Sequence, residues 1–125
     1  MKHSNLVRMM KIDTYLELFP DHAPKLVKID VEGFERQVLE GMKNLLKASN
    51  APCLIVEVCE GTHVNDEDGV DQLVGYLKTF GYQLFSSDIN GNLKPFTIGA
   101  TLNCIGLRNN GMNRLYEKGI SVDLG

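Results

Sequence analysis

The segment from Leu26 to Leu46 constrains the fold most, because three structural signals follow one another there without a gap. Leu26 to Asp30 is a short, mainly apolar run that predicts a β-strand. An acidic loop, Val31-Glu32-Gly33, comes next, and a helix follows it. Apolar residues of this helix recur at three- and four-residue spacing and therefore share one face. They are Phe34, Val38, Leu39, Met42, Leu45 and Leu46. The segment predicts one strand–loop–helix unit of an α/β domain.

Two single residues near this unit carry local predictions. Asp13 is placed to cap the start of a short helix that runs to Phe19. Gly41 falls inside the helix predicted from Phe34 onward, where glycine costs about 1 kcal/mol relative to alanine. A glycine at such a position indicates close contact between the helix and the sheet.

A second buried segment, Cys53 to Cys59, reads CLIVEVC and is almost continuously apolar. Such a run predicts a strand buried on both faces, as in a parallel sheet with helices above and below it. After a polar loop, apolar residues between Val70 and Phe80 mark an amphipathic helix, and Gly81 is placed as its C-cap.

The remaining segments predict an antiparallel end to the sheet. Tyr82 to Phe85 is expected to be a strand, and Asn90-Gly91 is a strong signal for a tight hairpin turn. Leu93 to Phe96 is expected to return from this turn as a strand, limited by Pro95, and Thr101 to Leu107 predicts a last strand. The order of elements predicts an α/β fold: parallel strands joined by crossover helices, with an antiparallel hairpin at one edge.

Length and charge exclude several classes of protein. With 125 residues, 43% of them hydrophobic, the chain is expected to form a single domain over residues 1–125. Residues 109–125, with three glycines, predict a helix-poor, mobile tail. The net charge is −3 and there is no basic stripe, which argues against nucleic-acid binding. No apolar run is long enough to cross a bilayer, and no charged-then-apolar leader is present, so a cytoplasmic protein is expected.

Cysteine and histidine spacing gives no indication of a metal site. These residues are Cys53, Cys59, Cys104, His3, His22 and His63. No two cysteines form a close pair, and only His63 lies near a cysteine, four residues after Cys59. A zinc site needs Cys and His at short, repeated spacing, so buried free thiols and no metal are expected.

The candidate site follows from the predicted sheet. In open α/β sheets, ligands bind outside the carboxyl ends of the strands. That rule selects the loop containing Asp30 and Glu32, and the segment from Glu57 to Gly61. Neighbouring strands lie about 4.8 Å apart. If the two strands are neighbours, Asp30 and Glu57 therefore share one rim.

Structural interpretations of the same residues stay open. Asp30 or Glu32 could serve only the start of the following helix, whose dipole stabilises nearby acids. Glu57 lies among apolar residues, where a carboxylate requires a partner, a raised pKa or an open position at the strand end. A structural hydrogen bond at Glu57 is therefore an alternative to catalysis. His63 follows in the polar loop, either as a surface residue or as a general base.

Two stretches resemble a known family. Lys28 to Met42 reads KIDVEGFERQVLEGM, and Leu54 to Val58 reads LIVEV. Together they resemble the FkbM family of S-adenosylmethionine-dependent methyltransferases. The family's hallmark is a strand ending K-I-D-x-E-G, a helix with E-x-x-V-L-x-G and a strand ending in E-V. Ile12 to Leu16 is similar to the segment that precedes this hallmark.

The resemblance implies the second half of a Rossmann-like class I methyltransferase sheet. It implies S-adenosylmethionine as cofactor and places Asp30, Glu32 and Glu57 at the family's acidic strand ends, facing the methyl group and the acceptor. Asp30 is the residue expected to contact the cofactor. The first half of such a domain carries a glycine-rich loop and an acid that binds the ribose, and neither is present.

Two functional hypotheses follow. The first is a partial methyltransferase domain that methylates oxygen, with a small-molecule or glycan hydroxyl as acceptor. The second is a non-catalytic, truncated or split half-domain that acts as an oligomerisation or partner-binding module. In either case the strand from Leu26 to Asp30 lacks its inner neighbour, and exposed apolar edges promote pairing. A homo-oligomer or a complementing chain is therefore expected.

Overall fold

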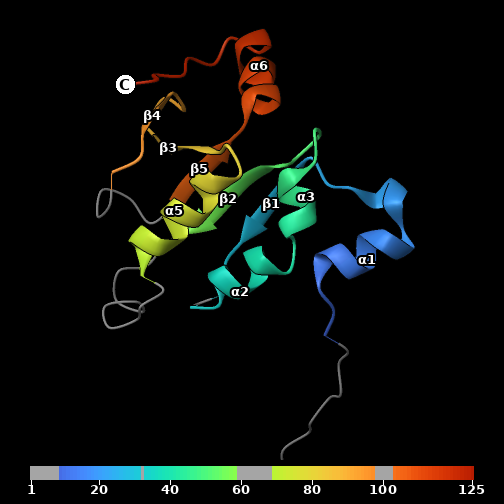
Figure 1. Ribbon diagram of the computed structural model, residues 1–125. Helices are drawn as coiled ribbons and strands as arrows, with labels where there is room; N and C mark the ends of the chain where they lie inside the picture. Colours follow the sequence, from blue (N-terminus) through green and yellow to red (C-terminus); the bar gives the residue numbers. More distant parts are fainter. Residues whose placement is uncertain (1–8, 32, 59–68, 98–102) are drawn as a thin grey trace, which may run out of the picture.

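The computed structural model describes residues 9–31, 33–58, 69–97 and 103–125, which form one five-stranded sheet with helices against it (Figure 1). The strands are β1 (Leu26–Ile29), β2 (Cys53–Glu57), β3 (Gln83–Ser87), β4 (Leu93–Pro95) and β5 (Asn103–Leu107). The helices are α1 (Ile12–Leu18), the 3-10 turn η1 (Pro20–His22), α2 (Glu35–Glu40), α3 (Lys43–Lys47), α5 (Val70–Thr79) and α6 (Asn109–Glu117).

The sheet is mixed, with the strand order β1-β2-β5-β3-β4. β1 and β2 pair in parallel, while β5 is antiparallel to both β2 and β3. β1, β2 and β3 consequently point the same way, and helices connect them in sequence. The predicted parallel pairing is confirmed for β1 and β2 only, because β5 returns between β2 and β3 instead of lying outside them. The predicted antiparallel hairpin at one edge is confirmed as β3–β4.

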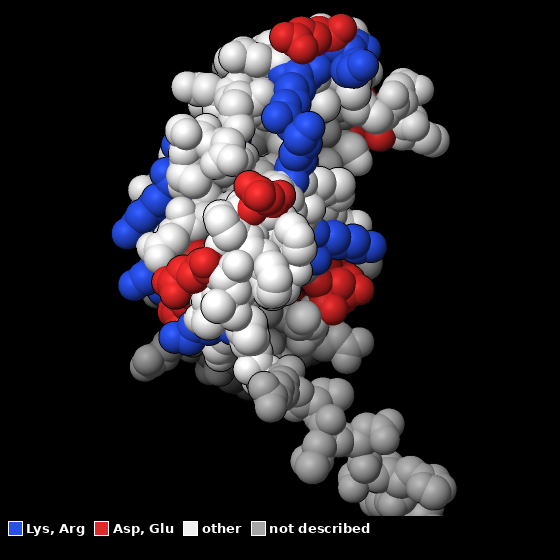
Figure 2. Space-filling model, turned by 90° about the vertical axis from the view of Figure 1, so that its right-hand side faces the viewer, with Lys and Arg blue, Asp and Glu red and all other residues white. Residues whose placement is uncertain are grey.

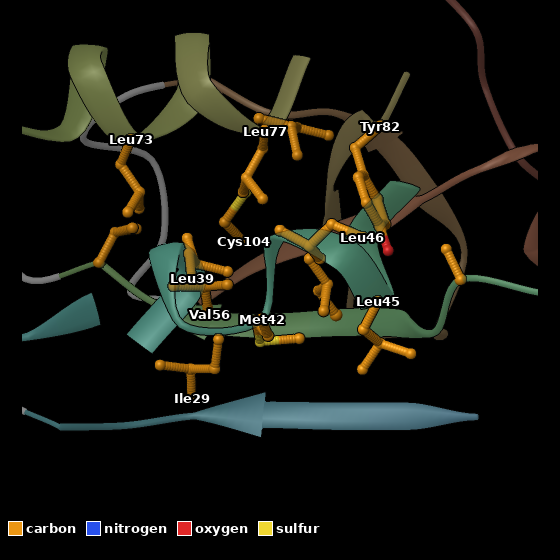
Figure 3. Close-up of a cluster of buried hydrophobic side chains, with 14 residues drawn as sticks. Ile29, Leu39, Met42, Leu45, Leu46, Val56, Leu73, Leu77, Tyr82 and Cys104 are labelled. Atoms are coloured by element: carbon orange, nitrogen blue, oxygen red, sulfur yellow. The ribbon is translucent and has the colours of Figure 1, made fainter. Parts of the chain in front are cut away.

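One face of the sheet is covered by helices. Ile29 and Val56 point from β1 and β2 toward Leu39 and Met42, and these four side chains are almost fully buried (Figure 3). The same cluster includes Leu45, Leu46, Leu73, Leu77, Tyr82 and Cys104. The buried Tyr82 hydroxyl is satisfied, since it donates a hydrogen bond to the Pro52 carbonyl over 2.7 Å. Helices α2, α3 and α5 therefore pack on a single hydrophobic face.

The described residues cover the opposite face only in part. Along β2, Leu54 and Val56 are buried, while Cys53, Ile55 and Glu57 are half-buried. The prediction that this strand is buried on both faces is therefore wrong. Helix α6 covers only part of the second face, where Phe85, Leu93, Leu107 and Met112 form a smaller cluster.

The helix predicted from Phe34 onward is interrupted at Gly41 and Met42. Asp13 explains where the second piece begins. Its backbone N–H donates to the Gly41 carbonyl over 2.9 Å, and its carboxylate accepts from the N–H groups of Asn44 and Leu45 over 2.9 and 3.2 Å. Asp13 thus caps α3 rather than its own helix α1, contrary to the sequence-based prediction.

Close packing at Gly41 involves a different neighbour from the one expected. A Cβ placed at Gly41 would lie 3.4 Å from Cγ of Lys11, in the segment that leads into α1. The glycine therefore allows contact with α1 and not with the sheet. Two other local predictions are confirmed: Gly81 ends α5 with φ +87°, and Gly91 adopts φ +83° in the β3–β4 turn.

Helix α6 overturns the expectation of a helix-poor tail. Met112 is buried and Leu115 packs against the second-face cluster. The Arg108 side chain, at the start of the helix, donates hydrogen bonds to the carbonyls of Leu46 and Ala48 over 3.0 and 2.6 Å. These tertiary contacts outweigh the weak helix propensity of Asn and Gly. Within the described ranges, no helix has the length and apolar character needed to span a membrane.

Candidate functional site

The carboxyl ends of β1 and β2 bring two of the predicted residues together. The parallel register pairs Ile29 with Val56. Asp30 and Glu57 each follow the paired residue by one position, on strands that lie about 4.8 Å apart. The structure therefore places both acids at one end of one strand pair, which we call the acidic rim.

The two acids of the rim differ in their surroundings. Asp30 is exposed, whereas Glu57 is half-buried at the end of β2, in register with Asn103 of β5. Glu57 and Asn103 each make an interaction of their own, so neither residue is without a partner. Because side chains alternate along a strand, Glu57 points to the face opposite the buried Val56. Asp30 is accordingly the more accessible acid of the rim.

Part of the predicted site cannot be placed. Glu32 lies outside the described residues, as do Cys59, His63 and the rest of the loop at residues 59–68. Glu32 would follow Asp30 by two positions. The acidic rim is therefore defined by Asp30 and Glu57.

Glu35 is a site-forming residue that the sequence analysis missed. It lies in the first turn of α2, is only 4% exposed, and accepts a hydrogen bond from the Gly33 N–H over 3.0 Å. Gly33 adopts φ +105°, a conformation that favours glycine. Glu35 therefore holds the loop that leaves the rim, and it occupies the helix-start position considered for Asp30 and Glu32. The sequence signal that could have identified Glu35 is a glutamate two residues after a glycine in a strand-to-helix loop.

An apolar hollow of about 520 Å³ is lined in part by Val31, which follows the rim residue Asp30 in the sequence. Its walls include Val31 and Phe34, which are 37% and 64% exposed. The remaining apolar walls are Met9, Met10, Ile12 and Val38. Lys11 and Gln37 add polar groups to a hollow whose walls are otherwise mainly apolar.

A second groove, of about 850 Å³, is polar and lies away from the rim. Lys11, Lys43 and Lys47 line it together with Glu40 and Tyr76. The positive charge is offset in part by Glu40, which also accepts an ion-pair hydrogen bond from Arg36 over 3.1 Å. The charges of this groove are therefore mixed.

The described thiols are not activated nucleophiles. Burial raises the pKa of Cys104 to about 12. Burial also raises the pKa of Cys53, although the positive charge of Arg114 partly opposes the shift. Reactive cysteines need a lowered pKa, so neither thiol suits nucleophilic catalysis. Among the residues that the structure describes, no three His, Cys, Asp or Glu side chains are grouped as metal ligands.

The acidic rim thus lies in a mixed α/β sheet at the carboxyl ends of two parallel strands, which is the end where open α/β sheets bind their ligands. The family model described as the Methyltransferase FkbM domain matches residues 3–84. The chain therefore belongs to the FkbM methyltransferase family, and the resemblance inferred from the sequence is confirmed. Comparison with curated proteins and with solved structures found no match.

Proposed function

We propose that the acidic rim forms one wall of an S-adenosylmethionine-dependent methyltransferase site that acts on a hydroxyl acceptor. One observation carries this proposal. In a chain of the FkbM family, Asp30 and Glu57 occupy adjacent positions at the carboxyl ends of two parallel strands. A Rossmann-like arrangement is part of the proposal, supported by the common direction of β1, β2 and β3 and the helices that connect them.

The residues of the rim fit one part of the cofactor. S-adenosylmethionine supplies a methyl group already activated on a positively charged sulfonium. Carboxylates such as Asp30 and Glu57 complement that charge. The sequence contains no G-x-G-x-x-G loop to hold the remainder of the molecule. The chain therefore supplies the acidic wall of the site and not the glycine-rich one.

Asp30 is the residue best placed to act on the acceptor. Its exposed carboxylate can accept the proton of an acceptor hydroxyl, which is the role of a general base. Glu57 already has an interaction partner. Its proposed role is to help orient the acceptor and to add negative charge to the site. The apolar hollow at Val31 and Phe34 would hold an apolar part of the acceptor next to that hydroxyl. Positioning of this kind supplies much of the rate in a transfer reaction.

Calorimetric titration with S-adenosylmethionine tests the proposal. We expect saturable binding that Asp30→Asn weakens about tenfold, since one charge interaction of about 1.4 kcal/mol is lost. Asp71→Asn, an exposed acid at the start of α5, is the matched control and should bind like the unaltered chain. Absence of binding by this chain, with binding by a chain extended upstream, would show that the acidic wall alone does not hold the cofactor. Absence of binding also by a chain extended upstream would favour the alternative, a non-catalytic half-domain.

A cytoplasmic location is part of the same proposal. The free thiols of Cys53 and Cys104 support it, because reducing compartments keep thiols unpaired. Fractionation of cells that express the tagged chain would test it. Recovery in a secreted fraction would contradict it.

A further inference from the structure

Three lysines line the polar groove of about 850 Å³ that lies between α3 and the end of α5. Lys11 precedes α1, while Lys43 and Lys47 begin and end α3. The other described walls are Glu40, Tyr76, Thr79 and Phe80. Neither acid of the rim is among these residues. The groove, which we call the lysine groove, is therefore a separate candidate site.

The lysines of this groove extend from backbone positions that tertiary contacts fix. The stem of Lys11 lies against Gly41, because a Cβ at that glycine would come within 3.4 Å of Cγ of Lys11. Lys43 and Lys47 are four residues apart on α3 and therefore share one face of the helix. The start of α3 is in turn held by the Asp13 carboxylate, which accepts two of its backbone N–H groups.

The lysine groove carries an excess of positive charge in a chain whose net charge is −3. Its acid Glu40 is paired with Arg36 over 3.1 Å. Burial, the charge of Glu40 and that of Asp13 raise the pKa of Tyr76, so Asp13 is a second acid near the groove. The three lysines and Arg36 against these two acids leave a net charge of +2. In the described part of the chain, none of the three lysines has an ion-pair partner.

The aromatic wall of the groove is held in a fixed arrangement. The Tyr76 and Phe80 rings meet edge to face, with centroids 4.9 Å apart. The Arg36 guanidinium lies 4.2 Å from the centroid of the Tyr76 ring, as a cation–π contact. The Thr79 hydroxyl donates a hydrogen bond to the Tyr76 carbonyl over 2.6 Å. The groove therefore combines ammonium groups with a rigid apolar wall, which suits an anionic organic ligand.

A phosphoryl group matches the charges of the lysine groove. It carries a charge of about −1.5 to −2 at neutral pH and offers three strong acceptor oxygens. Lysine binds such a group as a point charge. A single carboxylate brings one charge and two oxygens, and would leave more of the lysine charge without a partner.

We propose that the lysine groove binds a ligand that carries a phosphoryl group, whose oxygens contact Lys43 and Lys47. Charge over the whole molecule does not attract such a ligand. On the molecular face in Figure 2, basic and acidic side chains are interspersed, so there is no extended basic surface there. Binding consequently depends on the local lysines. The ligand site requires neither S-adenosylmethionine nor methyl transfer, so this proposal and the function proposed for the rim fail independently.

Titration of the chain with inorganic pyrophosphate at constant ionic strength tests the proposal. Two-dimensional NMR of the backbone amides should show saturable shifts in α3 and at the end of α5. Lys43→Gln and Lys47→Gln should each weaken binding about three- to fivefold, because each removes one exposed charge contact. The double variant K43Q/K47Q should weaken it about tenfold or more. Lys11 is left unchanged because it also lines the apolar hollow.

The matched control is Lys94→Gln, which removes one exposed charge from β4 and should leave pyrophosphate binding unchanged. The amide spectra report directly that each variant is folded. Absence of saturable shifts in α3 and α5 would overturn the proposal, as would equal weakening by Lys94→Gln. Citrate provides a polycarboxylate for comparison. Citrate binding as tight as that of pyrophosphate would overturn the assignment to a phosphoryl group.

A second measurement separates two sources of the phosphoryl group. The chain is sedimented with phosphatidylcholine vesicles that contain or lack a phosphoinositide. Binding only to the phosphoinositide vesicles, lost in K43Q/K47Q, would support the proposal with a lipid headgroup as ligand. Binding of pyrophosphate without binding to either vesicle would support it with a soluble phosphate compound.

Discussion

The two faces of the sheet are built by different means. On the helix-covered face, β1 and β2 supply buried side chains such as Ile29 and Val56, and three helices along the same stretch of chain cover them. On the second face, β2 supplies half-buried side chains, and the cover comes from α6, far along the chain. The first face rests on periodic apolar patterns within neighbouring segments. The second face depends on contacts between distant segments, and the described ranges cover it less fully.

The strongest test of this comparison uses two consecutive residues of β2. Leu54 is fully buried on the helix-covered face, while Ile55 is half-buried on the other. Leu54→Ala should lower the free energy of unfolding by about 3 kcal/mol, because a large buried side chain leaves a cavity. Ile55→Ala should cost about 1 kcal/mol. Urea unfolding followed by circular dichroism measures both, with the fully exposed Ile89→Ala as control. If both substitutions lowered the free energy of unfolding equally, the two faces would not differ in burial as described.

A second test concerns the fit of α6 to the second face. A Cβ at Gly111 would lie 2.8 Å from Sγ of Cys53. Gly111→Ala should therefore destabilise the protein by about 2 kcal/mol through overpacking. The cost should fall when Cys53→Ala removes the sulfur, which a double-mutant cycle in urea would detect.

The matched control for this test is Gly75→Ala in α5. Nothing lies within 4 Å of a Cβ at Gly75, so the change should stabilise the helix by up to about 1 kcal/mol. If Gly111→Ala behaved like Gly75→Ala, α6 would not pack as described.

A third test is a dependence of stability on alkaline pH, which should be smaller than the effects of Leu54→Ala and Gly111→Ala. Burial on the helix-covered face raises the pKa of Cys104 to about 12 from the ordinary value of 9.0. The unfolded chain therefore releases this proton first, and stability is complete below pH 9 and is lost as the pH rises toward 12. Between pH 9 and pH 10.5 the free energy of unfolding should fall by about 1.5 kcal/mol. Cys104→Val should reduce that slope. An unchanged slope would place Cys104 outside the buried core.

Patterns within short segments were sufficient to predict much of this protein. The strand at Leu26, the apolar positions of α2 and α3 and the amphipathic α5 all follow from periodic burial. Gly81 and Gly91 were predicted because a positive φ favours glycine. The motif from Lys28 to Met42 predicted the family, which the match over residues 3–84 confirms. The parallel direction of β1 and β2 was predicted from the helix between them, whereas their position as neighbours was established by the structure.

Contacts between distant segments could not be predicted in this way. Asp13 caps a helix 31 residues further on, and Arg108 reaches carbonyls at the end of α3. The position of β5 between β2 and β3 depends on which strand edge is free when the chain returns. At the site, sequence indicated Asp30 and Glu57, while the role of Glu35 emerged only from its hydrogen bond to Gly33.

The sequence by itself determined most of the strands and helices, though not α6, and also the family and the acidic residues at two strand ends. Each of these depends on neighbours a few positions apart, whose spacing is visible along the chain. Tertiary structure alone decided which face of the sheet the helices cover and where β5 enters. These features arise from burial and hydrogen bonding between segments distant in sequence, which local spacing does not encode.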